Sequence, residues 1–95
     1  MYTDINRKRR ILALNKLLGQ RLASLRIAAG VKQEDVAAAM GFGRPLVSKI
    51  EGGHRALDAM ELPDYAAAIH VEPEVLFSEI KHIVSEYDSS EANKG

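Results

Sequence analysis

Apolar residues recur every three or four positions along most of this chain, which is the spacing of an amphipathic helix. The longest run predicts a first helix that starts at Thr3 or Asp4, either of which can cap it, and ends at Gly30. Its inward positions are Ile11, Leu14, Leu18, Leu22, Leu25 and Ala29. Runs of alternating polarity between hairpin turns do not occur, so the pattern predicts an all-α fold.

Glycine and proline divide the remaining chain into four shorter helices. Gly41 ends the second helix and the Gly52-Gly53 pair ends the third, because glycine readily adopts the left-handed conformation found after helix ends. Pro73, a residue type favoured in the first turn, opens the fifth. The predicted helices cover residues 33–40, 45–51, 59–69 and 73–87, and a polar, flexible tail follows at 88–95.

The composition is that of one compact domain, with 95 residues of which 46% are hydrophobic and 27% charged. Cysteine is absent, which excludes disulfides, thiolate metal sites and cysteine nucleophiles. Charges interrupt every apolar run before the roughly 18 residues that a membrane span needs, and the polar start carries no export signal. We therefore expect a cytoplasmic protein that does not contact a membrane.

The net charge of zero hides a strong asymmetry along the chain. Residues 1–33 carry eight cations against Asp4 alone, residues 34–55 are balanced, and residues 56–95 carry nine acidic groups against two lysines. This distribution favours a start that faces a polyanion and a separate acidic end. The alternative is that the two ends neutralise each other in the fold.

The most informative segment is residues 33–52, QEDVAAAMGFGRPLVSKIEG, in which a tight turn joins two short helices. Such helices cross steeply, so a small residue is needed where they approach, and Ala37 fills that position. Gly41 lies at the turn, where a left-handed backbone is easily adopted only by glycine. The positions predicted to face inward are Val36, Met40, Phe42, Val47 and Ile50.

This segment resembles the helix-turn-helix of the lambda-repressor/Cro-like, or XRE, family of DNA-binding regulators. The similarity extends from about Leu18 to Phe77 and includes LGQRLASLRIAAGVKQEDVA, LVSKIEGGHR and AAAIHVEPEVLF. It implies an all-α, five-helix repressor-like domain with extended N- and C-terminal helices. The chain then divides into a basic extension (helix or arm) at 1–17, the DNA-binding domain at 18–77, a dimerisation helix at 78–87 and the tail at 88–95.

The resemblance assigns roles to individual positions. In this family the third helix lies in the major groove and the second crosses the DNA backbone. By position this implies base contacts from Arg44, Pro45, Ser48 and Lys49, and phosphate contacts from Lys32, Gln33, His54 and Arg55. Gln33 also matches a glutamine that braces the recognition helix, and Arg26 and Glu51 match a structural ion pair. Arg44 is the expected guanine reader, because arginine pairs with guanine in a bidentate manner.

Pro45 departs from the family pattern, in which a polar base reader often occupies this position. Proline has no side-chain donor, although from the first helical turn it can contact a thymine methyl. It also favours an extended backbone at Arg44, which would make Arg44 the helix cap rather than an interior residue. With fewer base contacts available, we expect specificity to depend on phosphate register and DNA shape.

The helical pattern continues past Leu76 and Phe77, the residues expected to close the core. The continuing apolar face consists of Leu76, Ile80, Ile83, Val84 and Tyr87. A solvent-facing stripe of this size is typical of a partner surface, and one helix-turn-helix reads few base pairs. We therefore predict a twofold homodimer through this face. The alternative is that the stripe packs within the chain against the N-terminal extension.

The N-terminal extension combines a basic run, RKRR at 7–10, with apolar residues at 11–14. The cations favour an arm or helix that neutralises phosphates. The apolar residues favour packing on the acidic C-terminal helix, beside Glu79 and Glu86, within one subunit or across a dimer. If both interpretations hold, the apolar face of the extension contacts protein and its cationic face lies near DNA.

Catalytic and metal-binding signals are weak. His82 has Glu79 and Glu86 at helical spacing, but a lone E-x-x-H without further inward carboxylates is typical of a solvated face. The sequence contains no phosphate-binding loop, nucleophile elbow or zinc-ligand spacing. We therefore expect no enzymatic activity, no metal and no cofactor.

The sequence as a whole is interpreted as a transcriptional regulator that binds double-stranded operator DNA as a homodimer on a palindromic site. Two narrower roles fit the same size: a restriction–modification controller protein, or the antitoxin of a toxin–antitoxin pair whose acidic C-terminal half binds the toxin. A protein–protein adaptor that uses the fold without DNA is a third hypothesis, because fold does not imply function.

Overall fold

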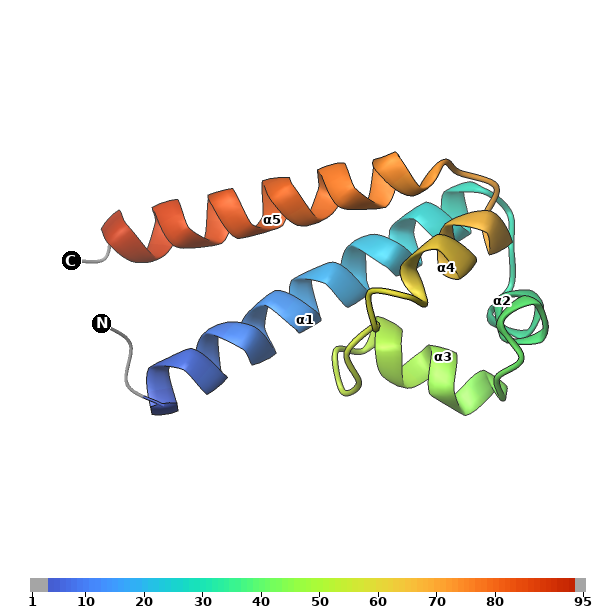
Figure 1. The fold of residues 1–95 in the computed structure, drawn as a ribbon, viewed down its shortest axis with the longest axis horizontal. Helices are drawn as coiled ribbons and strands as arrows, with labels where there is room; N and C mark the ends of the chain where they lie inside the picture. The colour runs from blue at the N-terminus through green and yellow to red at the C-terminus, as the bar shows by residue number, and fades with distance from the viewer. Residues whose placement is uncertain (1–3, 94–95) are drawn as a thin grey trace.

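The computed structural model describes residues 4–93, which form five helices and no strand, as the all-α prediction requires (Figure 1). The helices are α1 (Asp4–Ala28), α2 (Gln33–Met40), α3 (Arg44–Glu51), α4 (Leu62–Ala68) and α5 (Pro73–Asn93). The long helices α1 and α5 lie antiparallel and side by side, and the three short helices pack where α1 ends and α5 begins. Within the described range no helix is long and apolar enough to cross a membrane.

The helix boundaries largely follow the glycines and prolines of the sequence. The N-terminal extension is helical from Asp4 onward and continues into the domain as one helix; Thr3, the other predicted cap, lies outside the described residues. α4 begins at Leu62, later than predicted. The residues before it form a turn instead, in which the Met60 amide donates a hydrogen bond of 2.8 Å to Asp58 Oδ1.

Residues 88–93 do not form the predicted flexible tail but continue α5 to Asn93, whereas residues 94–95 lie outside the described part. Arg10 of α1 donates hydrogen bonds of 3.0 and 2.9 Å to the carboxylate of Asp88. Arg21 and Glu79 form a second ion pair between the two long helices, at 3.0 Å. Part of the basic start is therefore neutralised by the acidic end within the fold.

The core lies where the short helices meet α1 and the start of α5. Its largest fully buried side chains are Leu22, Val36, Val47, Ile50, Tyr65, Ile69 and Leu76. Met40 and Phe42, also predicted to face inward, are half-buried against this cluster. Phe77 does not close the core as expected, because its side chain is 57% exposed.

The apolar face of α5 packs against α1 instead of remaining free for a partner. Leu76 is completely buried and Ile83 is 7% exposed, so neither can make the dimer contact predicted for it. Ile80, Val84 and Tyr87 are half-buried. A groove of about 180 Å³ remains between the two helices, lined by Ile11, Leu14, Asn15, Leu18, Ile80, Ile83 and Val84. The extended first helix therefore covers much of this face within the chain.

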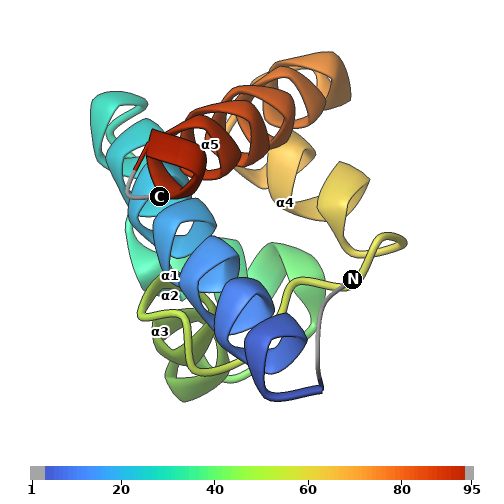
Figure 2. The same cartoon turned by 90° about the vertical axis from the view of Figure 1, so that its left-hand side faces the viewer.

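Two glycines allow α3 and the turn after it to lie directly against α1. A Cβ at Gly19 would stand 2.5 Å from the carbonyl oxygen of Glu51, and one at Gly53 would stand 2.6 Å from Cα of Lys16. Gly53 also has a φ of +80°, which side chains rarely adopt. These contacts fix α3 on the side of α1 opposite to α5 (Figure 2).

Candidate nucleic-acid interface

Helices α2 and α3 form a helix-turn-helix whose turn depends on Gly41. This glycine has a φ of 73°, and the next amide, that of Phe42, donates a hydrogen bond of 2.8 Å to the carbonyl of Ala37. Gly43, in an extended conformation, is the N-cap of α3. Arg44 is therefore the first residue inside the helix and not its cap, and Pro45 follows in the first turn, where a missing amide hydrogen costs little.

One side of α3 is buried and the other faces solvent. Val47 and Ile50 are in the core, whereas the four predicted base readers, Arg44, Pro45, Ser48 and Lys49, are all exposed. Because side chains three and four residues apart share a helix face, these four form one surface that begins at the first turn of α3. The structure therefore presents the predicted readers together and outward.

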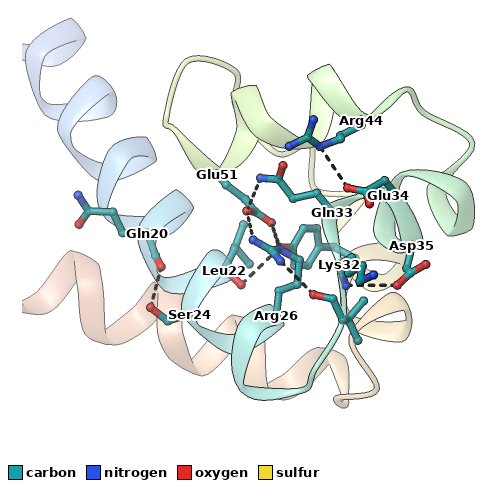
Figure 3. Close-up of polar contacts among 12 residues, drawn as sticks. Gln20, Leu22, Ser24, Arg26, Lys32, Gln33, Glu34, Asp35, Arg44 and Glu51 are labelled. Carbon is teal, nitrogen blue, oxygen red and sulfur yellow. Dashed lines mark hydrogen bonds and ion pairs between the residues drawn. The ribbon is translucent and has the colours of Figure 1, made fainter.

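Arg44 is held loosely by a neighbour on α2. Its Nε lies 3.2 Å from Glu34 Oε1, and both side chains are more than 60% exposed (Figure 3). Ion pairs this exposed contribute about 0–1 kcal/mol and are screened by salt. Glu34 can therefore orient the guanidinium without preventing it from changing partner.

The last turn of α3 is fixed by a buried polar cluster around Glu51 (Figure 3). Arg26 of α1 donates to both carboxylate oxygens, at 2.7 and 2.9 Å. Gln33 of α2 donates at 3.0 Å, and the Tyr65 hydroxyl of α4 donates at 2.6 Å. A further guanidinium hydrogen bond of 2.9 Å reaches the Val31 carbonyl. One carboxylate thus ties α3 to α1, α2 and α4.

The pKa shifts of Glu51, Tyr65 and Arg26 show which protonation state of each group the cluster stabilises. Burial opposes the charged form of Glu51, but hydrogen bonds from Arg26, Tyr65 and Gln33 outweigh it and hold the pKa of Glu51 below its usual value. Burial and then the hydrogen bond to Glu51 raise the pKa of Tyr65 far above its ordinary range. The hydrogen bond to Glu51 also raises the pKa of Arg26. At neutral pH the cluster therefore holds one fixed arrangement of protons.

The four predicted phosphate contacts divide into two exposed and two engaged side chains. Lys32, the N-cap of α2, and His54, in the turn after α3, are exposed. Gln33 is occupied by Glu51, which is the bracing role expected of it. Arg55 is paired with Glu61, with a hydrogen bond of 2.9 Å to Oε2, and its guanidinium lies 5.3 Å from the ring centre of Phe42. Gln33 and Arg55 therefore have structural roles before any ligand is considered.

Tyr65 is the member of the polar cluster that sequence reasoning missed. It lies among alanines in α4 and is completely buried. A buried tyrosine usually needs a partner for its hydroxyl, which was the available signal. The sequence does not show which residue that partner is, because Glu51 is 14 residues away and on another helix.

Comparison with known proteins places this arrangement in a family. A helix-turn-helix domain family matches residues 17–78. An XRE-family like protein from Pseudomonas syringae pv. tomato str. DC3000 is 34% identical with a TM-score of 0.65, over 75% of this chain and 87% of that one. The restriction-modification controller protein C.AhdI from Aeromonas hydrophila is 38% identical with a TM-score of 0.60, over 67% and 96%.

A third solved structure, the clp gene regulator ClgR from C. glutamicum, shares the fold with a TM-score of 0.66 at 23% identity, over 73% of this chain and 90% of that one. A search of curated proteins gave no significant match. The matched residues 17–78 contain the helix-turn-helix and the polar cluster, and they exclude the first half of α1 and most of α5. The chain belongs to the XRE family of helix-turn-helix DNA-binding regulators.

Proposed function

We propose that the protein regulates transcription by binding a palindromic operator as a homodimer, with the start of α3 in the major groove. The observation that carries this proposal is the exposed surface formed by Arg44, Ser48 and Lys49 on a helix whose opposite side is fixed in the core. Such preorganisation matters because base readers must meet the groove in one register. The family membership supports DNA as the ligand.

Arg44 is the proposed guanine reader, with Ser48 and Lys49 one turn further into the groove. Lys32, the residue before α2, and His54, in the turn after α3, are both exposed and are the proposed phosphate contacts. Pro45 offers a thymine methyl only an apolar contact, so part of the specificity is assigned to DNA shape.

The dimer surface cannot include Leu76 and Ile83, because both are buried within one chain. Phe77, Ile80 and Val84 lie three and four residues apart, on one side of α5. Phe77 is largely exposed, and Ile80 and Val84 line the groove that Ile11 of α1 completes. We assign a second copy of the chain to this apolar strip, because a twofold dimer presents two recognition helices to a palindrome.

A narrower role, that of a restriction–modification controller, is favoured by one observation. The likeness to C.AhdI covers 96% of that chain at 38% identity, so nearly the whole of that protein has a counterpart here. Binding upstream of the protein's own gene, next to a methyltransferase or endonuclease gene, would support this role.

Footprinting on genomic fragments tests the proposal, and we expect two protected half-sites about one helical turn apart. Arg44→Ala should weaken binding to the footprinted site by about 1–3 kcal/mol and relax specificity there. Lys32→Ala, the matched control, should weaken binding to all duplexes about equally. If the two variants behave alike, Arg44 does not read a base. Failure of the wild-type protein to bind any duplex at low salt would instead favour the adaptor hypothesis.

A further inference from the structure

The cations of α1 fall into two groups that differ in their partners. Arg10, Arg21 and Arg26 face other helices and pair with Asp88, Glu79 and Glu51. Arg7, Lys8, Arg9 and Lys16 are exposed, and among the side chains of residues 5–93 no carboxylate lies in ion-pair range of them. The neutralisation of the basic start by the acidic end is therefore incomplete.

Three of the four unpaired cations lie near the start of their own helix, where the helix dipole gives them no stabilisation. Arg7, Lys8 and Arg9 lie in the first two turns of α1, which begins at Asp4. The positive end of the helix dipole does not favour cations, and its effect is already small beyond the first turn. Their position is therefore not explained by the stability of α1, and residues that break a local rule in this way are often functional.

The helical register shows which side of α1 these cations occupy. Gly19 and Lys16 mark the side that contacts α3, because the backbones of Glu51 and Gly53 pack against them. Residues seven positions apart lie nearly in line on a helix. Arg9 lies seven residues before Lys16, and Leu12 lies seven before Gly19, so the register places both on the α3 side. Arg9 lies at the edge of that side, because it also borders a hollow lined by Asp88 of α5.

Lys8 adjoins the same surface, since it lies one turn before Leu12, whose side chain is also exposed. Arg7 lines one hollow with Lys8, Ile11 and Leu12, but it lies about 160° around the helix from Arg9 and so faces away from α3. The first half of α1 therefore presents Lys8, Arg9 and Lys16 toward the side of the molecule that carries α3.

The placement of α1 carries these cations past the end of α3. α1 meets the turn after α3 at Lys16, and the residues before it project beyond that turn. Figures 1 and 2 both show the start of α1 reaching the level of α3, on the side away from α5. From Lys8 to Lys16 the helix advances about 12 Å, over which a duplex carries about seven phosphate charges.

We propose that Lys8, Arg9 and Lys16 form a second contact with the DNA phosphates, outside the helix-turn-helix and beyond the C-terminal end of α3. This inference rests on the proposed function, because α3 must face DNA for the first half of α1 to reach it. The contact is independent of base sequence, so it strengthens operator and non-operator binding together.

Arg9→Ala and Arg7→Ala form a matched pair, with the same charge removed from exposed positions two residues apart on one helix. Binding of a fluorescein-labelled duplex of mixed sequence is measured by anisotropy over a range of salt concentrations. Each lost phosphate contact should reduce the slope of log K against log salt by about 0.9. Counted per bound protomer, we expect that reduction for Arg9→Ala, no change for Arg7→Ala, and about three times that reduction for the triple variant K8A/R9A/K16A.

Equal slopes for Arg9→Ala and Arg7→Ala would overturn the inference, since any effect would then be one of net charge alone. An unchanged slope for the triple variant would also overturn it. If the slope of the triple variant is unchanged but Arg44→Ala loses its preference for the operator, the inference fails and the proposed function is still supported. If Arg44→Ala does not alter operator preference while Arg9→Ala still reduces the slope, the proposed base reading by α3 fails and the phosphate contact stands.

Discussion

Glu51 illustrates how a single side chain can fix the orientation of a recognition helix. Its carboxylate accepts four hydrogen bonds, from Arg26, Gln33 and Tyr65, and each donor belongs to a different helix. A buried charge is tolerated only when its lone pairs are satisfied in this way. The cluster therefore fixes the orientation of α3 relative to the other helices, in addition to stabilising the fold.

Glu51→Gln should destabilise the fold by about 3 kcal/mol, since it leaves the partly buried guanidinium of Arg26 without a charged partner. Urea denaturation followed by circular dichroism measures this loss. Glu34→Gln is the control, because its carboxylate is exposed and pairs only loosely with Arg44. A stability loss below 1 kcal/mol for Glu51→Gln would show that the cluster is not stabilising.

The pH dependence of stability follows from the same carboxylate. The pKa of Glu51 is lower in the folded state than its unfolded value of about 4.3, so its stabilising effect is complete above that pH. As the pH falls through the folded pKa, the carboxylate is protonated and the effect is lost. The stability gap between wild type and Glu51→Gln should therefore narrow toward acid, and a gap independent of pH down to 3 would contradict this account.

At the scale of helices, the sequence predicted the elements better than the surfaces between them. Gly41 and the 3.6-residue pattern located α2, because turn chemistry and periodicity are local. The apolar stripe of α5 was ambiguous, since a helix shows the same pattern whether its own chain or a second copy covers it. The tail at 88–93 was misjudged for the same reason: its helical state involves a contact between Asp88 and Arg10, 78 residues away.

The crossing of α1 and α3 gives a prediction at this scale. Gly19→Ala would place a Cβ 2.5 Å from a backbone carbonyl that cannot rotate away, so α1 and α3 must move apart. Alanine gains up to about 1 kcal/mol of helix propensity, but overpacking costs about 1–3 kcal/mol or more. We expect a net loss of about 1–2 kcal/mol in urea denaturation. Gln20→Ala, exposed on the same helix, should be nearly neutral, and a stabilised Gly19→Ala would refute the close approach.

At the scale of the whole molecule, some of the basic residues near the N-terminus pair with acidic residues of α5 and others stay available for a ligand. Arg10 and Arg21 join α1 to α5, and Arg26 joins it to α3, while Lys8, Arg9 and Lys16 form no ion pair with the described side chains. Composition revealed the asymmetry of the sequence but not this division, because pairing depends on which way each residue of a continuous helix faces. The strip formed by exposed Phe77 and half-buried Ile80 and Val84 likewise becomes apparent only after α1 has covered Leu76 and Ile83.

Phe77→Ser should separate dimer formation from folding. Phe77 is exposed, so the monomer should keep its unfolding free energy, whereas Ile83→Ala removes buried contacts and should cost about 2–4 kcal/mol. A twofold interface contains Phe77 twice, and losing two such burials weakens the dimer by roughly 2–4 kcal/mol, which is more than tenfold in Kd. Light scattering across a concentration series measures this shift. Ile27→Ser removes a similarly exposed apolar side chain that lines a separate hollow with Lys32 and Arg44, so it should leave dimerisation unchanged. A Phe77→Ser protein as dimeric as wild type would place the interface elsewhere.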